Sequence, residues 1–124
     1  MLLAESLTEQ VVGLAIEVHR NTGPGLLEAV YEQCVCVELR RAGVRFARQV
    51  PIPVLYKGER VGDGFKADVV AADQLILEIK SVATILPVHE MQLQTYLRTS
   101  GIRVGLLLNF NAPRLMDCLR RYMV

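Results

Sequence analysis

The sequence is poor in the features that mark several protein classes. Tryptophan is absent and aromatic residues make up 6% of the 124 residues, so no stretch forms an obvious stacking platform for nucleic-acid bases. The formal net charge is +1, so any nucleic-acid-binding surface must be local. No apolar run approaches the roughly 20 residues that a membrane-spanning helix needs, which argues against a membrane protein.

Cysteine is scarce as well. Cys34, Cys36 and Cys118 are odd in number and lack the spacing of a metal site. We therefore expect reduced thiols in the core of a cytoplasmic protein. The N-terminus has no basic segment followed by an apolar core and a cleavage site, so we expect no signal peptide.

The length and pattern of the chain indicate one α/β domain over residues 1–124. Hydrophobic residues make up 52% of the chain, enough for a sizeable core, and no repeat or linker interrupts it. Apolar spacing predicts helices over residues 6–20, 26–42, 87–99 and 114–122. It predicts strands over residues 44–50, 51–56, 65–71, 75–81 and 104–110, the last parallel to a neighbour because a helix precedes it. We expect an α/β sandwich, a mixed central sheet flanked by helices.

The most informative stretch is residues 75–81, a short apolar segment that carries two charges. Side chains alternate across a strand, so Glu78 and Lys80 share one face, separated by roughly 7 Å of rise. A charge on an interior strand costs free energy unless it is paired or binds a metal. An ion pair, or a strand face open to water, would also explain this pattern.

The preceding strand, residues 65–71, brings a second acid to the same place. If the hairpin folds about Asp73, Asp68 lies opposite Glu78, with Cβ atoms about 5 Å apart. Two such carboxylates repel each other, and a divalent cation, Mg²⁺ or Mn²⁺, would resolve the conflict. The inference depends on register, because a slip of one residue would separate the two side chains.

Other polar residues have a structural and a functional interpretation. Glu28, in the first turn of its helix, either favours the helix dipole or points back at the carboxylate pair. Glu32 is expected on the solvated face of that helix. Gln92 and Tyr96 are four residues apart and share a helix face, where they are most simply a surface amide and a core edge. Four arginines could form a phosphate-binding patch, or could equally well belong to a solvated helix end and turn: Arg40, Arg41, Arg45 and Arg48.

The combination of these residues resembles the PD-(D/E)xK nuclease superfamily. The resemblance consists of Asp68, then Glu78-x-Lys80, then Gln92-x-x-x-Tyr96, with an acidic residue on an early helix. The spacing of the glutamine and the tyrosine is similar to that of the superfamily's RecB-like branch. A restriction-endonuclease-like fold is implied.

A closer resemblance is to the bacterial and archaeal GxxExxY protein family. Its motif is matched by Gly25, Glu28 and Tyr31, and the resemblance extends over nearly the whole chain. One departure is visible, because Ala67 precedes Asp68 where the superfamily's name has a proline.

The resemblance implies a role for each residue of the pattern. Asp68 and Glu78 would hold Mg²⁺ or Mn²⁺, and Glu28 would contact the metal directly or through water. Lys80 would position the attacking water or stabilise the pentavalent phosphate. Gln92 and Tyr96 would orient the site or contact the substrate backbone.

Three functional hypotheses follow. The first is a metal-dependent nuclease that hydrolyses nucleic-acid phosphodiester bonds, with DNA as the expected substrate. The second is a non-catalytic module that retains the fold as a binding or regulatory partner. The third is an assembly protein whose apolar first helix makes a dimer, although a homodimer is compatible with a nuclease too.

Overall fold

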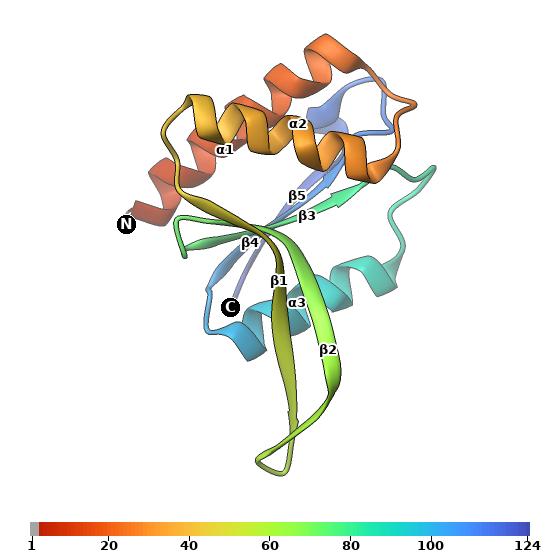
Figure 1. The fold of residues 1–124 in the computed structure, drawn as a ribbon. Coiled ribbons are helices and arrows are strands. Elements are labelled where there is room, and N and C mark those ends of the chain that lie inside the picture. The colour runs from red at the N-terminus through yellow and green to blue at the C-terminus, as the bar shows by residue number, and fades with distance from the viewer. Residues whose placement is uncertain (1–2) are drawn as a thin grey trace.

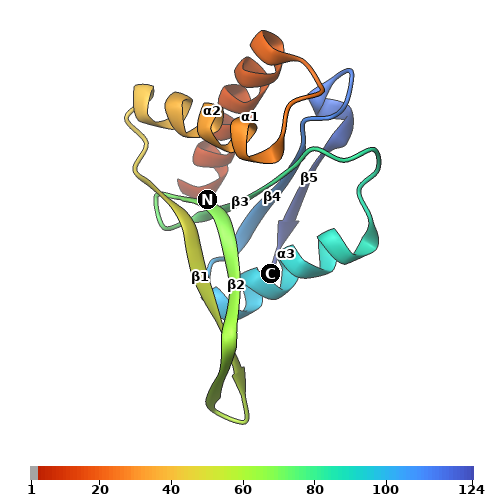
Figure 2. The same ribbon diagram turned by 45° about the vertical axis from the view of Figure 1, so that its right-hand side comes forward.

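The computed structural model describes residues 3–124, apart from the side chains of residues 3, 4, 63 and 64. The described chain forms one five-stranded sheet with helices on both faces (Figure 1). The elements are α1 Leu3–Thr22, α2 Glu28–Arg41, β1 Phe46–Tyr56, β2 Glu59–Ala71, β3 Leu75–Lys80, α3 Pro87–Ser100, β4 Val104–Asn109, the short 3-10 helix η1 Leu115–Cys118, and β5 Leu119–Met123. Helices α1 and α2 cover one face and α3 covers the other, as two views agree (Figure 2). The predicted α/β sandwich is confirmed.

The strands follow one another across the sheet in chain order, β1 to β5. All neighbours are antiparallel except β3 and β4, which are parallel because α3 carries the chain back between them. The β2–β3 hairpin pairs Val69 with Leu77 and Ala71 with Leu75, so it folds about Asp73 as predicted.

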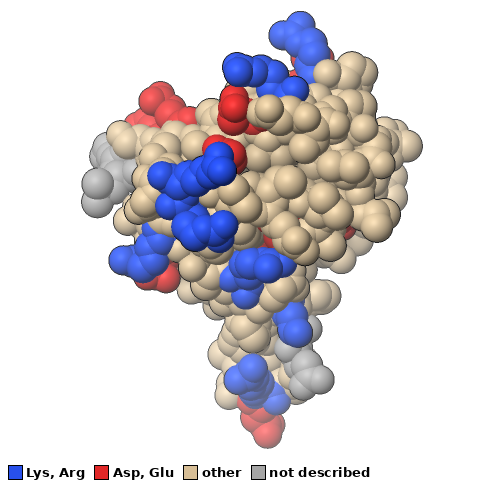
Figure 3. All heavy atoms as spheres, turned by 45° about the horizontal axis from the view of Figure 1, so that its top comes forward, with Lys and Arg blue, Asp and Glu red and all other residues tan. Residues whose placement is uncertain are grey.

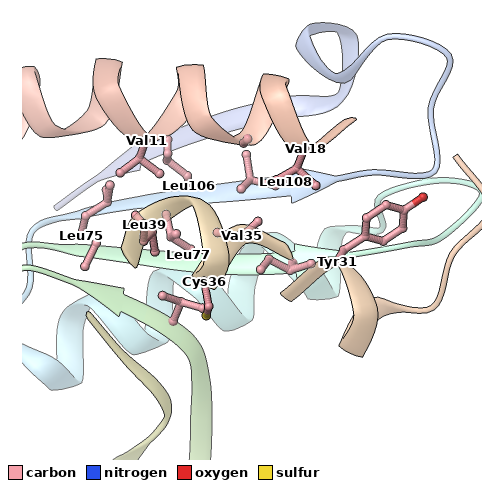
Figure 4. Packing of buried hydrophobic residues seen from close by; sticks show 14 of the residues in the cluster. Val11, Val18, Tyr31, Val35, Cys36, Leu39, Leu75, Leu77, Leu106 and Leu108 are labelled. Carbon is pink, nitrogen blue, oxygen red and sulfur yellow. The ribbon is translucent and has the colours of Figure 1, made fainter. Parts of the chain in front are cut away.

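The core lies on both faces of β3 and β4. Leu77 and Leu106 point toward α1 and α2, where Val11 and Leu39 pack over them (Figure 4). Ile76, between the leucines of β3, points the other way, toward α3. Strands buried on both faces explain why these segments are nearly continuous apolar runs. Within the described chain, no helix is both long enough and apolar enough to cross a membrane.

Two local predictions differ from the structure. Residues 114–122, expected as a helix, form η1 and β5, so that prediction is wrong. The reason is tertiary pairing: β5 adds to the edge of the sheet beside β4, with Leu119 opposite Leu108. Residues 46–56, expected as two strands, form one strand that passes through an unusual backbone conformation at Gln49, where φ is 50°.

The β1–β2 hairpin extends beyond the rest of the sheet. Its two strands pair from Phe46–Ala71 to Tyr56–Glu59, whereas β2 pairs with β3 only through residues 69–71. Residues 50–67 therefore continue past β3 as a two-stranded ribbon. Its base packs against α3 through the buried Ile52 and Ala67, and its tip projects from the domain (Figure 1, Figure 2). We call this segment the β-arm.

Candidate active site

Asp68 and Glu78 lie together where β2 separates from β3. The last backbone pair between these strands on this side is Val69–Leu77. Beyond it, the two carboxylates take the place of backbone acceptors. The N–H of Asp68 donates to Glu78 Oε1 (3.1 Å), and the N–H of Ile79 donates to Asp68 Oδ2 (2.8 Å). The carboxylates thus satisfy two donors that the parting strands leave without a ladder partner.

Each carboxylate keeps one oxygen for another partner. Asp68 Oδ1 and Glu78 Oε2 accept no hydrogen bond from the described residues. Among the described residues, every fully buried side-chain oxygen has a hydrogen-bond partner. Because these two oxygen atoms have none, both must be open to solvent. Glu78 as a whole is only 5% exposed, so little water would screen the attraction between its carboxylate and a bound cation.

The electrostatics of the site favour the arrival of positive charge. Burial raises the pKa of Glu78 to about 8, and the nearby charge of Asp68 adds to the increase. Burial likewise raises the pKa of Asp68, against the hydrogen bond from Ile79. Burial, then the charges of Glu78 and Asp68, raise the pKa of Tyr96 to about 12. All three shifts have the signs expected of buried groups with too little counter-charge.

Lys80 ends β3 on the same side of the strand as Glu78. Its ammonium charge lowers the pKa of both Asp68 and Glu78, so it lies within electrostatic reach of both. The side chain is half-buried and has no hydrogen bond or ion pair with any residue that the structure describes. Its N–H donors are therefore free for a ligand.

Glu28 connects the start of α2 with the end of β3. Its Oε2 accepts from the N–H of Ser81 (3.2 Å), and Ser81 Oγ donates to the carbonyl of Leu26 (2.6 Å). The charge of Glu28 raises the pKa of Asp68, so the two acids are near each other. Glu28 thus lies within electrostatic reach of Asp68, while its carboxylate accepts from Ser81; its role at the carboxylate pair stays a prediction.

The loop before α2 is held by the tyrosine of the same motif. The hydroxyl of Tyr31 donates to the carbonyl of Gly23 and accepts from the N–H of Leu26 (3.1 Å). The Tyr31 ring stacks on Phe110, with centroids 4.7 Å apart and planes 13° from parallel. Gly25 has φ of 107°, a conformation that favours glycine. The motif thus builds the loop that places Glu28 at the end of β3.

A second glutamate of α2 belongs to the site, and the sequence analysis missed it. Glu32 was expected on a solvated face, but it is 5% exposed. Its carboxylate accepts from Arg48 Nε and Nη2 (3.0 and 2.9 Å) and from Gln49 Nε2 (2.8 Å). Its charge also raises the pKa values of Asp68 and Glu78. Its position one helical turn after Glu28, on the same helix face, was the signal that could have found it.

Helix α3 packs on the face of the sheet that carries Ile76 and, by alternation along β3, Glu78. Tyr96 is 5% exposed, packs in the core on this face of the sheet and lies within electrostatic reach of the two carboxylates. Gln92, one turn earlier, is half-buried, and its side chain has no hydrogen bond with the described part of the chain. The two share a helix face. Tyr96 is thus beside the site, and a contact of Gln92 with a ligand stays a prediction.

The four arginines considered as a phosphate-binding patch divide into two kinds. Arg45 pairs with Asp73 (2.9 Å) and Arg48 with Glu32, whereas Arg40 and Arg41 are exposed at the end of α2. Figure 3 shows Lys and Arg side chains gathered along one side of the molecule, from the helices down to the β-arm. This surface is positively charged in part although the whole chain is nearly neutral.

The donor set fits a divalent cation bound by two carboxylates. No group of three or more His, Cys, Asp or Glu side chains within the described residues is arranged to hold a metal ion. Asp68 and Glu78, which hydrogen-bond to neighbouring backbone N–H groups, nevertheless each offer one hard oxygen atom that has no hydrogen bond from the described residues. Mg²⁺ is typically held by one or two carboxylates, with water and substrate phosphates completing its coordination. A direct bond from Glu28 to such an ion stays a prediction.

Comparison with known protein families identifies the chain's superfamily. The family model described as the PD-(D/E)XK nuclease superfamily matches residues 5–122, almost the full length of the chain. No curated protein and no solved structure matches it.

Proposed function

The chain belongs to the PD-(D/E)XK nuclease superfamily, and from this premise we propose that it hydrolyses nucleic-acid phosphodiester bonds with Mg²⁺ or Mn²⁺. The observation that carries the proposal is the pairing of Asp68 and Glu78 where β2 and β3 separate. Each acid has an oxygen left over for a ligand, and the Lys80 side chain, within electrostatic reach of both, has no hydrogen bond or ion pair with the described residues. DNA is the substrate we propose.

Within this proposal the site residues have distinct tasks. Asp68 Oδ1 and Glu78 Oε2 would hold the cation, which supplies charge compensation and an activated water when bound. Water adds to phosphorus and gives up a proton to solvent, the ester bond to one sugar oxygen breaks, and that oxygen takes up a proton from solvent. Lys80 donates hydrogen bonds to the phosphate oxygens, where negative charge develops. Glu28 would contact the cation directly or through water.

The same proposal covers the narrower family and the remaining residues. We also propose that the chain is a GxxExxY protein: it matches the motif at Gly25, Glu28 and Tyr31, and each of these residues has a structural task in the loop before α2 or at the end of β3. Gln92 and Tyr96 would orient the substrate backbone, as in the RecB-like branch. Reduced thiols fit a cytoplasmic location, and a homodimer, which light scattering would detect, could address two strands.

Cleavage assays test the proposal directly. Plasmid, single-stranded and branched DNA should be cut by the wild type with Mg²⁺ or Mn²⁺ and left intact in EDTA. Asp68→Asn removes a charged ligand and should lower the rate by at least about 10²-fold. Arg103→Ala, at the far end of β4 from the site, is the matched control and should leave cleavage unchanged. Activity that survives in Asp68→Asn would show that the site is assigned wrongly.

One observation favours a non-catalytic binding module as the second candidate. Asp68 and Glu78 satisfy backbone donors at the strand split, so the fold alone gives a reason to keep both acids. Calorimetric titration with Mn²⁺ separates the two candidates. Uptake that disappears in Asp68→Asn supports the enzyme, and absence of uptake by the wild type supports the module.

A further inference from the structure

The β-arm carries large apolar side chains that the fold leaves uncovered. Leu55, Tyr56 and Val61 are exposed toward its tip, and Phe65 is exposed near its base. Phe65 differs from the others in its position, because it precedes Asp68 by three residues on the same strand. It is the exposed aromatic ring closest in sequence to the carboxylates.

Phe65 also differs in what supports it. Its ring centroid lies 5.5 Å from that of Tyr96, and the two planes meet at 49°. Tyr96 is buried and lies within electrostatic reach of Asp68 and Glu78, so Phe65 packs on a ring that is near the carboxylates. Phe65 is nevertheless 43% exposed, so much of its surface faces solvent at the rim of the site.

Resting on the nuclease function proposed above, we propose that Phe65 stacks on an unpaired base of the bound strand, next to the scissile phosphate. The substrate class is then single-stranded nucleic acid, or a strand with a base out of the stack. A base within a duplex has both faces covered by its neighbours, and unstacking it costs a few kcal/mol. An unpaired base offers a free face, and every base has one, so this selection ignores sequence.

The cations of the β-arm complement the ring. Lys57, Arg60 and Lys66 are exposed along the ribbon. Lys66 follows Phe65 directly, so its side chain points to the opposite side of the strand. Contacts between such cations and phosphates do not depend on whether the bases are paired. The aromatic ring therefore provides selectivity for unpaired bases, and the cations provide general attraction.

Binding measurements with Phe65→Leu test the inference, because leucine keeps the apolar bulk and removes the flat ring. The probe is a fluorescently labelled deoxyoligonucleotide, alone and as a duplex, measured by anisotropy with Mn²⁺. Both proteins also carry Lys80→Met so that the probe stays intact. Base stacking of about 1–3 kcal/mol corresponds to roughly 5- to 150-fold weaker binding of the single strand. Binding of the duplex should stay within twofold, an allowance on the order of 0.4 kcal/mol.

A spectroscopic readout separates stacking from a structural effect. 2-Aminopurine, placed at successive positions of the oligonucleotide, loses fluorescence where it stacks on a ring, and Phe65→Leu should abolish the loss at one position. Phe65→Tyr should restore it. Tyr56→Leu removes an exposed ring at the arm tip and is the matched control, expected to leave that position unchanged. A ribo-oligonucleotide of the same sequence shows which sugar the site accepts.

The outcomes distinguish this inference from the function on which it rests. If the wild type cleaves DNA and Phe65→Leu binds single strand and duplex as tightly as its parent, the stacking role is overturned and the nuclease stands. Equal weakening for both probes also overturns it. If single-strand binding depends on Phe65 while the wild type cleaves nothing, the nuclease proposal fails and the stacking surface stands.

Discussion

Glu32 of α2 holds Arg48 of β1 through hydrogen bonds to both Nε and Nη2, at 3.0 and 2.9 Å. The next residue, Gln49, has φ of 50° and also donates to Glu32. Because Arg48 pairs with Val69 and β1 and β2 are antiparallel, Gln49 lies opposite Asp68. The helix therefore anchors the backbone bend that faces a proposed metal ligand.

Replacing Glu32 with glutamine tests this anchor. The amide keeps the shape but loses the charge, so the bond to the guanidinium weakens and the bend loosens. We expect a loss of about 1–2 kcal/mol in the free energy of unfolding, kept small because Arg48 is half exposed and can rehydrate. Urea denaturation measures it, with Glu9→Gln on an exposed part of α1 as the control. Equal stability of the two variants would show that the bonds between Glu32 and Arg48 do not stabilise the fold.

Tyr31→Phe tests the loop that carries Glu28. The substitution removes one hydroxyl and leaves the carbonyl of Gly23 and the N–H of Leu26 without their partner. The free energy of unfolding should fall by about 1–2 kcal/mol, since the stacked ring stays in place. Tyr56→Phe, with an exposed side chain on the β-arm, should cost nearly nothing in the same urea titration. A loss of equal size in both variants would contradict the proposed loop contact.

The pH dependence of stability follows from Glu78. The ordinary pKa of a glutamate is 4.5, whereas burial, then the charge of Asp68, raise the pKa of Glu78 to about 8 in the folded protein. Between these values the folded state holds more protons than the unfolded state, so the free energy of unfolding falls as the pH rises. Well above pH 8 the Glu78 carboxyl is ionised in both states, so its contribution to the stability of the folded state is fully lost.

Glu78→Gln should remove this part of the pH dependence. The amide oxygen can still accept from the N–H of Asp68, so the strand split stays satisfied. In EDTA, the wild type should lose stability on the order of a few kcal/mol from about pH 5 to pH 9, and the variant should lose distinctly less. Urea titrations at the two pH values measure the difference. Parallel curves for the two proteins would mean that Glu78 is ionised in the folded protein throughout this range.

Lys80→Met should separate catalysis from folding and metal uptake. Methionine matches the length of the side chain, and Lys80 has no hydrogen bond or ion pair with the described chain that its loss would break. Stability should change by less than about 1 kcal/mol, and Mn²⁺ should still bind to Asp68 and Glu78. The rate of cleavage should fall by about 10²- to 10³-fold, because a donor to the developing charge is gone. A variant that cuts DNA at the wild-type rate would exclude Lys80 from the chemistry.

Sequence pattern predicts those parts of the molecule whose partners are near in the chain. The helices α1, α2 and α3 and the apolar strands follow from local spacing. The meeting of Asp68 and Glu78 is also local, because a short connection folding about Asp73 leaves one register that buries the apolar face of β3. Ten positions separate the two acids, and a hairpin turn closes that distance.

Other features depend on contacts between distant segments. Residues 119–123 form a strand because the edge of β4 offers hydrogen-bond partners to their backbone. The local spacing of apolar residues carries no information about this pairing. Glu32 is buried because Arg48, 16 residues away, folds back onto it. Phe65 stands at the rim of the site because α3 brings Tyr96 beneath it.

The chain by itself thus determined its class, its core strands and the pair of acids, since periodicity and a tight turn act over a few residues. Tertiary packing alone decided which residues surround Asp68 and Glu78, which glutamate of α2 is buried, and where the β-arm projects. The physical reason is that burial, and the pKa shifts it causes, depend on which surfaces meet in space.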